Sequence, residues 1–390
     1  MTRSVADHAH AVAALFPDDL TAETVAVTAA LGRVLAADVT SPLDLPVFRN
    51  SQMDGYAVRA ADLVTVPTEL PVASVTAAGD APATLPPGHA IKIMTGAPLP
   101  DGADTVVPVE DTKADGSTVR IEHGRSPGEF VRDPGADVHR GELLLPADVT
   151  IAARHVAVLA AVGIGDVSVR RKLRVAMLTT GAELVPAGEP LGPGQIYNSN
   201  GIALAAAAEA NGAEVTSVAH STDDVATFTT RLDAALAQAD VVFTSGGVSM
   251  GDFEVVRETL IPRGGWFHHV AMQPGGPQGL TVVDGVPVLS FPGNPVSTLV
   301  SFEVFARPVL RRLAGLPTLE SQPARLASDL RSPPGKRQFH RGLRTENGVE
   351  LVSGPGSHLI AAMARADVLI DVPSQVTELP IGADVQVWEL

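Results

Sequence analysis

Residues 239–254 read Ala-Asp-Val-Val-Phe-Thr-Ser-Gly-Gly-Val-Ser-Met-Gly-Asp-Phe-Glu, and they decide the fold of the chain. The apolar, β-branched run 240–244 predicts a buried strand, and 255–260 predicts a helix. Between them stand Ser245, Gly246 and Gly247, where small residues let backbone N–H groups approach an anion. A strand, a glycine turn and a helix form a geometry that holds phosphate. The stretch therefore predicts an α/β domain with a phosphate-binding loop.

The residues after the glycine turn decide which kind of phosphate site the loop predicts. A P-loop carries a lysine here, whereas this chain carries Asp252 and Glu254. Carboxylates repel a phosphate unless a hard divalent cation lies between them. The loop therefore predicts a phosphate-bearing ligand bridged by Mg²⁺.

Composition narrows the class of protein. With 390 residues, 45% of them hydrophobic, the chain has apolar material for about two to four packed domains. A net charge of −16 is the wrong sign for general nucleic-acid binding, and the lack of cysteine excludes thiol chemistry. Neither residues 1–10 nor the longest apolar stretch, 156–169, has the pattern of a signal peptide or a membrane span. We therefore expect a cytoplasmic protein that binds neither nucleic acid nor membrane.

Strand and helix patterns alternate between residues 173 and 313. Strands are predicted over 173–178, 214–219, 240–244 and 286–291, and helices over 202–210, 225–237, 255–260 and 298–313. Such alternation predicts a doubly wound parallel sheet, which binds ligands beyond the carboxyl ends of its strands. The polar residues that follow strand ends are Glu183, Asp223, Asp224, Asp252, Glu254 and Ser297. We expect them to converge on one site, although Asp223 could instead cap the helix that begins at Val225.

Two further regions have the pattern of β domains. From 47 to 146, and again after 316, short Val, Thr and Ile runs alternate with proline and glycine. Two helices are predicted ahead of the first β region, over 5–16 and 28–37. The cationic runs 169–174 and 336–342 are interpreted as solvated faces.

Two clusters in the first β region are unusual for turns. They are Asn50-Ser-Gln-Met-Asp-Gly-Tyr-Ala57 and Met94-Thr-Gly-Ala-Pro98, with a weaker third at Gly135-Ala-Asp-Val138. Taken alone, Asp54-Gly55 is a strong hairpin signal, and a hairpin turn is the simpler interpretation of it.

Four motifs in order resemble those of one family. The first two clusters, the loop Thr244–Gly251 and Phe291-Pro-Gly-Asn-Pro-Val-Ser297 are together similar to the molybdopterin molybdenumtransferase (MoeA) family, which includes the E domain of gephyrin. The resemblance extends from Leu31 to Leu359 and implies a multidomain, elongated homodimer of α/β plus β class. Its implied parts are a discontinuous linker and dimerisation domain (1–46 and 147–172), an inserted β module (47–146), a doubly wound α/β molybdopterin-binding domain (173–315) and a C-terminal β-barrel-like domain (316–390).

The resemblance also implies a reaction. The family inserts molybdate into adenylylated molybdopterin and releases AMP with Mg²⁺, in a cleft shared by two subunits. A molybdopterin adenylyltransferase and molybdoenzyme maturation proteins are the implied protein partners. The positions that match the family's functional acids and loop threonine are Asp54, Thr95, Asp137, Glu183, Asp223 and Glu254, of which Asp54 and Thr95 would reach across the dimer. The metal-ligand candidates are Glu183, Asp223, Asp252 and Glu254. The positions that match pterin- and oxyanion-binding residues are Ser245, Gly246, Gly247, Ser249, Gly251, Pro292, Gly293, Asn294, Ser297, Arg341 and Ser357.

One departure from the family pattern affects the molybdate site. Many members carry two lysines around a Pro-Gly pair, and this chain has Gln273 and Gly276 at those places. A neutral amide forms a weaker hydrogen bond to an anion than an ammonium does. We hypothesise that this chain needs more molybdate than two-lysine relatives, unless Arg341 or Lys336 compensates. An unchanged molybdate half-saturation after Gln273→Lys and Gly276→Lys together would contradict this.

Three other functions fit part of the same residues. A degenerate pterin-binding scaffold without insertion activity is favoured by the missing lysines, but it would not need Asp54, Glu183 and Glu254. A single-domain molybdopterin adenylyltransferase shares the Thr-Ser-Gly-Gly loop but does not need the inserted β module. A generic phosphatase has only the carboxylate cluster in its favour.

Overall fold

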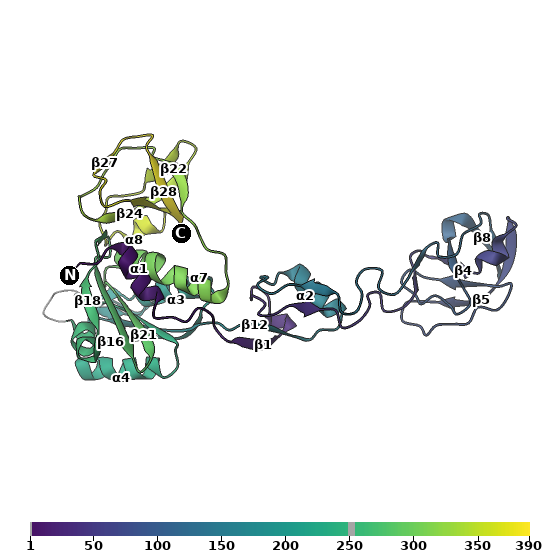
Figure 1. The fold of residues 1–390 in the computed structure, drawn as a ribbon, viewed down its shortest axis with the longest axis horizontal. Coiled ribbons are helices and arrows are strands. Elements are labelled where there is room, and N and C mark those ends of the chain that lie inside the picture. Colours follow the sequence, from purple (N-terminus) through teal and green to yellow (C-terminus); the bar gives the residue numbers. More distant parts are fainter. Residues whose placement is uncertain (1, 249–253) are drawn as a thin grey trace. The chain divides into compact units, whose positions relative to one another are not determined.

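The computed structural model describes residues 2–248 and 254–390 and divides into two compact units (Figure 1). Unit one consists of Met1–Glu23 and Val169–Leu390, and unit two of Thr24–Ser168. Within the described part of the chain, no helix has the length and apolar character needed to cross a membrane. The four predicted domain boundaries stay predictions.

A six-stranded sheet forms the centre of unit one. Its strands lie in the order β16 (Glu214–Ser221), β13 (Arg174–Thr180), β17 (Val241–Ser245), β21 (Val286–Phe291), β20 (Pro277–Val283) and β18 (Trp266–His269). The first four are parallel, as predicted, whereas β20 and β18 run antiparallel to their neighbours. The sheet is therefore mixed. The reversal of chain direction between β20 and β21 occurs at Asp284-Gly285, where φ is +51° and +84°. Two successive positive φ angles at Asp-Gly form a tight hairpin turn.

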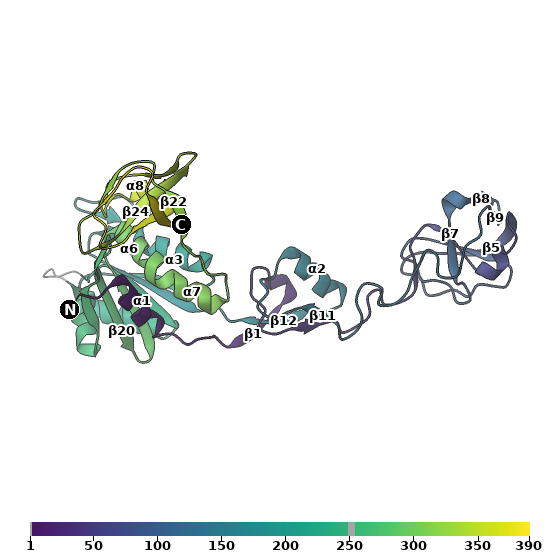
Figure 2. The same ribbon diagram turned by 45° about the horizontal axis from the view of Figure 1, so that its top comes forward.

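Helices cover both faces of this sheet, so the α/β class is confirmed. Alternate residues of β13 show why: Val175 and Met177 pack into one apolar cluster, and Ala176 and Leu178 into the other. The first cluster also receives residues of α1 (Val5–Ala13), α3 (Asn200–Ala210), α6 (Pro295–Ser301) and α7 (Arg307–Ala314). The second receives residues of α4 (Val225–Leu236) and α5 (Val255–Leu260), and α4 lies on the opposite side of the sheet from α1 and α7 (Figures 1 and 2).

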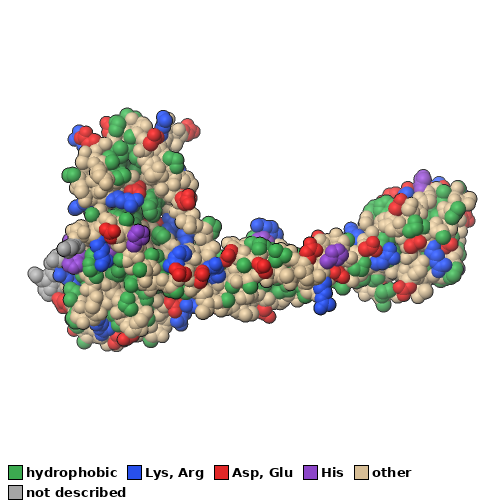
Figure 3. All heavy atoms as spheres, in the orientation of Figure 1, with side chains coloured by type: hydrophobic (Ala, Val, Ile, Leu, Met, Phe, Trp, Pro, Cys, Tyr) green, Lys and Arg blue, Asp and Glu red, His purple; other side chains and the backbone are tan. Residues whose placement is uncertain are grey.

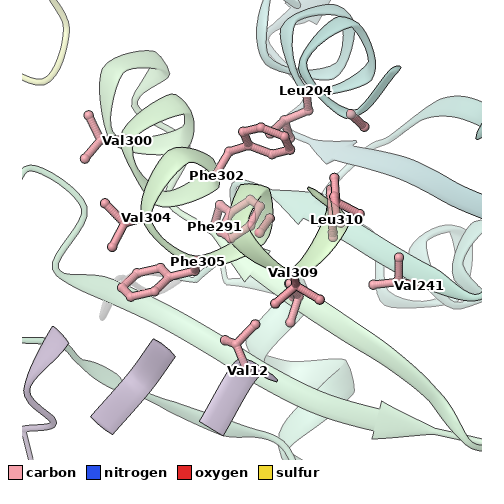
Figure 4. Packing of buried hydrophobic residues seen from close by; sticks show 14 of the residues in the cluster. Val12, Leu204, Val241, Phe291, Val300, Phe302, Val304, Phe305, Val309 and Leu310 are labelled. Carbon is pink, nitrogen blue, oxygen red and sulfur yellow. The ribbon is translucent and has the colours of Figure 1, made fainter. Parts of the chain in front are cut away.

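The predicted single helix over 298–313 is interrupted. Between α6 and α7 lies a π-helical segment, Phe302–Ala306, which ends two residues before Pro308. Proline has no N–H to continue the ladder of a helix, which favours a local change of hydrogen-bond register. The segment still contributes to the core: Phe302 and Phe305 point into the cluster that contains Phe291 (Figure 4).

The predicted helix over 28–37 is wrong. Only Val27–Ala29 is helical, as a short 3₁₀ turn. Gly32 then takes a φ of +76°, and its N–H donates to the carbonyl of Ile151 at 2.8 Å. The N–H of Leu35 donates to the carbonyl of Val149 at 3.0 Å. The segment is thus paired with a distant stretch of chain, which periodicity of apolar residues alone does not reveal.

Unit two contains the second six-stranded sheet. Its order is β7 (Thr105–Pro108), β4 (Gly55–Val58), β6 (Ala90–Ile93), β5 (Thr68–Thr76), β9 (Thr118–Ile121) and β8 (Thr112–Asp115). All neighbours are antiparallel except β5 and β6. The short strand β3 (Asn50–Ser51) pairs with β10 (Val131–Arg132), and unit two also contains helix α2 (Ala153–Ala161).

A third six-stranded sheet joins the C-terminal region to the α/β region within unit one. Its order is β19 (Met272–Gln273), β24 (Arg337–Thr345), β26 (Val368–Val372), β28 (Asp384–Glu389) and β22 (Gln322–Arg325), with β25 (Gly348–Leu351) on β24. Because β19 pairs in parallel with β24, Gln273 lies opposite Gln338. Helix α8 (Ile360–Met363) precedes β26.

The remaining elements are β1 (Ala22–Ala26), β2 (Val39–Thr40), β11 (Leu143–Leu145), β12 (Asp166–Arg170), β14 (Leu184–Val185), β15 (Ile196–Tyr197), β23 (Leu330–Arg331), β27 (Glu378–Leu379) and the 3₁₀ helices η2 (Ala60–Leu63), η3 (Val109–Asp111) and η4 (Ile261–Arg263).

The basic run 169–174 is paired with acids. Acidic and basic side chains are interspersed on the face shown in Figure 3. Arg170 forms an ion pair with Asp19 at 2.7 Å. Arg174 contacts Asp240 at 2.9 Å, and Arg171 contacts the same carboxylate. The run therefore ties the start of β13 to the start of β17.

We expect Asp240→Asn to lower the free energy of unfolding by about 1 kcal/mol at pH 7. Burial alone would raise the pKa of Asp240, but hydrogen bonds from Arg174 and Arg171 outweigh it and lower the pKa to about 2. Since the folded pKa lies below the ordinary value of 3.8, the carboxylate stabilises the fold above that pH, and the contribution is lost as pH falls toward 2. Urea unfolding at pH 7 and pH 3 checks this. An equal difference between wild type and variant at both values would contradict it.

Candidate functional site

The glycine turn after β17 is held in a conformation that only glycine tolerates well. Gly246 and Gly247 have φ of +98° and +64°. A Cβ atom on Gly246 would lie 2.8 Å from the carbonyl oxygen of Thr180, and one on Gly247 would lie 2.8 Å from Cγ2 of Val256. The turn is therefore packed against the ends of β13 and α5.

The turn offers fewer N–H groups to an anion than the sequence predicts. The N–H of Gly246 donates to the carbonyl of Phe291 at 3.2 Å. For the N–H of Gly247, no backbone acceptor is found among the described residues. Thr180 lies next to both glycines, and its buried Oγ1 has no hydrogen-bond partner within the described part of the chain. Gly247 and Thr180 are thus the groups near the turn that a phosphate can engage.

Ser245 contributes to the site as a structural group. Its hydroxyl, 2% exposed as a residue, lies 3.2 Å from the carbonyl of Pro292 and 3.1 Å from Oγ1 of Thr298. Asn200 donates from Nδ2 to Ser245 Oγ at 2.9 Å and to the carbonyl of Gly293 at 2.8 Å. These bonds lock together the start of α3, the end of β17 and the turn before α6.

A first cavity of about 690 Å³ opens above these loops. Its lining residues include Thr180, Glu183, Asn200, Asp223, Ser245, Gly246, Gly247, Glu254, Pro292, Gly293, Asn294, Ser297 and His358. Three of the predicted acids therefore converge at the carboxyl ends of the parallel strands. Ser249, Gly251 and Asp252 lie outside the described residues.

The structure separates the roles of the two neighbouring aspartates. Asp224 caps α4, because its Oδ2 accepts from the N–H of Thr227 at 2.7 Å. Asp223 instead accepts from the N–H of Ala182 at 3.2 Å and faces the first cavity. The alternative that Asp223 only caps a helix is therefore wrong.

The acids of the first cavity do not form a preformed metal cage. Among the described residues, no group of three or more His, Asp or Glu side chains could hold a metal ion. Magnesium, however, is usually held by one or two protein carboxylates together with waters and substrate phosphates. The oxygen donors of Glu183, Asp223 and Glu254 are compatible with that kind of shared site.

A second cavity of about 430 Å³ adjoins the first. Pro277, Asn294, Ser297 and His358 line both cavities. The second is also lined by Gln273, Gly275, Gly276, Lys336 and Ser357. The two positions that depart from the family pattern therefore lie beside a cation, Lys336, that comes from a different part of the chain.

Arg341 reaches this region indirectly. It is 2% exposed, and its guanidinium donates to Ser353 Oγ at 2.9 Å and to the carbonyl of Gly354. It thus holds the start of the loop that carries Ser357. Within the described residues, Arg341 lines neither cavity.

Unit two brings Asp54 and Thr95 together. The N–H and Oγ1 of Thr95 donate to Asp54 Oδ1 at 2.7 and 2.9 Å, and both bonds lower the pKa of the Asp54 carboxyl. The hairpin interpretation of Asp54-Gly55 is wrong, because β4 pairs with β6 and β7 rather than with β3. Gly55 is required for close approach instead, since a Cβ there would lie 2.1 Å from the carbonyl oxygen of Val107.

Asp137 is the remaining predicted acid of unit two. It lies between β10 and β11, is exposed, and its N–H donates to the carbonyl of Leu45 at 2.9 Å. Its role stays a prediction.

Three successive stretches of the chain match known protein families. Residues 3–163 match the MoeA N-terminal region (domain I and II), 176–312 match a probable molybdopterin binding domain, and 323–390 match the MoeA C-terminal region (domain IV). A Mycobacterium tuberculosis protein named molybdopterin molybdenumtransferase 2 is 44% identical over 411 residues, with the whole of both chains covered. The chain belongs to the MoeA family.

Further MoeA-family relatives agree with this. A Nostoc protein named molybdopterin molybdenumtransferase is 39% identical, with 94% of this chain and 88% of the relative covered. The crystal structure of a MoeA protein from Pyrococcus horikosii superposes with a TM-score of 0.81 at 33% identity, covering 100% of this chain and 99% of that one. The family predicted from four motifs is confirmed.

Sequence reasoning missed some residues of this MoeA-family site. Asn200, the first residue of α3, was not predicted, and its side chain donates to Ser245 and to the carbonyl of Gly293. Thr180 and His358 also line the first cavity without having been predicted. Thr180 is the last residue of β13, and position at a strand end was the signal that identified the nearby Glu183.

Proposed function

We propose that this MoeA-family chain, a transferase of molybdenum cofactor biosynthesis, inserts molybdate into adenylylated molybdopterin and releases AMP in the same cycle. The observation that carries the proposal is the pair of adjoining cavities. The first has three carboxylates and a glycine turn suited to a phosphoanhydride, and the second has amide, hydroxyl and ammonium groups suited to an oxyanion. A pterin nucleotide lying across their shared wall would present its anhydride to one cavity and its dithiolene to the other.

In anhydride hydrolysis, different residues of the first cavity would bind phosphate, hold the metal and activate water. In this proposal the N–H of Gly247 would donate to a phosphate oxygen, and the unpartnered hydroxyl of Thr180 would contribute a second donor. Glu183, Asp223 and Glu254 would hold Mg²⁺, which neutralises phosphate charge when bound. A carboxylate of this set that stays free of the metal orients and deprotonates the attacking water.

Asp54, Thr95 and Asp137 belong to the same proposal through a homodimer. Asp54 and Thr95 form an exposed, hydrogen-bonded pair in unit two. We infer that the pair and Asp137 act on the nucleotide held by a partner subunit, so that each site needs two chains. The resemblance to the family supports this arrangement.

The test is the coupling between the two half-reactions. Purified chain given adenylylated molybdopterin, Mg²⁺ and molybdate is expected to release AMP and to incorporate molybdenum in equal amounts. A scaffold would bind the nucleotide without release of AMP. An adenylyltransferase would instead make the adenylylated pterin from ATP and molybdopterin. Either of these results, obtained without molybdenum incorporation, contradicts the proposal.

A further inference from the structure

Two buried polar side chains, Gln338 and His340, and the half-buried Gln273 form a chain of hydrogen bonds that ends at the second cavity. Gln338 Nε2 donates to Gln273 Oε1 at 2.9 Å, and Gln338 Oε1 lies 2.7 Å from His340 Nε2. Gln338 and His340 are 1% and 6% exposed. Gln273 stands on β19, opposite Gln338 on β24, so backbone pairing fixes their separation. Of the three, Gln273 lines the second cavity.

The direction of these bonds determines which end of Gln273 the cavity meets. A carboxamide has one accepting oxygen and one donating nitrogen. The oxygen of Gln273 accepts from Gln338, and within the described residues no hydrogen bond from its Nε2 is found. The oxygen of Gln338 in turn needs a donor, which His340 supplies from a protonated Nε2. Burial, with a smaller contribution from Arg341, lowers the pKa of His340 to about 4, so the ring is neutral and carries this single proton.

The wall of the second cavity contains few charged side chains. Lys336 is the only Lys, Arg, Asp or Glu side chain among the described residues that line it. An oxyanion in this cavity depends on neutral donors as well as on that ammonium. A reversed Gln273, with its oxygen inward, would repel the anion.

We propose that Gln338 is a positioning residue for an oxyanion site: it holds Gln273 with its amide N–H₂ group toward the second cavity. Gln273 is then a neutral donor to a tetrahedral oxyanion, beside the ammonium of Lys336. The assignment of molybdate as that oxyanion rests on the proposed function.

A double-mutant cycle tests this on the full-length chain. Molybdate binding is measured by titration calorimetry for wild type, Gln273→Met, Gln338→Met and the double variant. We expect Gln273→Met to weaken binding about tenfold and Gln338→Met about fivefold. In the Gln273→Met background, Gln338→Met is expected to change binding by less than about twofold, because it has nothing left to orient. A distant change, Gln238→Met, should leave the affinity unaltered.

Three results overturn the inference. Fully additive effects would mean that Gln338 acts on the fold rather than through Gln273. Equal affinities of all variants would mean that the amide does not face the anion, while leaving the AMP-release proposal intact. If molybdate fails to bind wild type, both the inference and the molybdate step of the proposed function fall.

A second variant covers the case in which Gln338→Met does not fold. Gln338→Glu keeps the size of the side chain but only accepts hydrogen bonds, so Gln273 must turn its nitrogen to residue 338 and its oxygen to the cavity. We expect molybdate affinity to fall at least tenfold. Adding Gln273→Lys should restore it, because an ammonium donates to the carboxylate and still attracts the anion. No loss with Gln338→Glu, or no restoration by the second change, would contradict the proposed orientation.

Discussion

Gly246→Ala is expected to lower the free energy of unfolding by about 3 kcal/mol and to remove measurable binding of the pterin nucleotide. Two effects add. The φ of +98° is unfavourable for alanine, at a cost of about 1–2 kcal/mol. The new Cβ would also lie 2.8 Å from the carbonyl oxygen of Thr180, in the backbone of central strand β13, which cannot move aside. Relief of this clash must displace the turn from the first cavity. Urea unfolding and nucleotide binding measure the two consequences.

A second glycine provides the control for Gly246→Ala. Gly264 ends η4 with a φ of +86°, and a Cβ there would meet no atom within 4 Å. Gly264→Ala therefore carries the backbone strain without the clash, and we expect a loss of about 1 kcal/mol with nucleotide binding retained. Equal losses for the two variants would show that packing against Thr180 contributes nothing.

Neutralising the acids of the first cavity is expected to slow AMP release by about 10²-fold or more, with nucleotide binding changed far less. Glu183→Gln and Asp223→Asn keep the size of each side chain, and an amide oxygen at 223 can still accept from the N–H of Ala182. The loss is therefore one of charge and proton acceptance. Single-turnover release of AMP measures it, and Glu189→Gln, an exposed acid outside the cavity, is the control.

The Mg²⁺ dependence of these variants separates metal binding from water activation. If the replaced carboxylate holds the metal, the variant binds Mg²⁺ more weakly, and excess Mg²⁺ should recover part of the rate of AMP release. A carboxylate that takes the proton of water leaves a rate that stays low at any Mg²⁺ concentration. Variants with wild-type rates at both positions would contradict a catalytic role for this cavity.

The sequence predicts best what depends on neighbours along the chain. The four parallel strands and the acids at their ends follow from local patterns, and three of those acids line one cavity. The Asp284-Gly285 hairpin was equally local and could have been predicted. In contrast, the pairing of 32–35 with 149–151 replaced a predicted helix, because nothing near Leu35 specifies that distant partner.

The candidate site shows the same division between local and distant information. Glycines at 246 and 247 indicate a tight turn. The hydrogen bond from the Gly246 N–H to the carbonyl of Phe291, however, depends on the pairing of β17 with β21. The contact of Gln273 with Gln338 joins residues 65 positions apart in the chain. Its consequence for an oxyanion could not be inferred from the residue type at 273 alone.

The second cavity has a consequence for how the family's reaction is divided between modules. Gln273 and Gly276 come from the α/β region, whereas Lys336 and Ser357 come from the C-terminal region joined to it by β19 and β24. The glycine turn at Gly246 and Gly247, by contrast, belongs to the α/β region alone. In the proposed function, an α/β module without the C-terminal region would keep the glycine turn that binds the nucleotide. It would lack Lys336 and Ser357 in the wall of the second cavity. In the proposed function, the C-terminal region therefore supplies the ammonium of Lys336 and the hydroxyl of Ser357 to the oxyanion compartment.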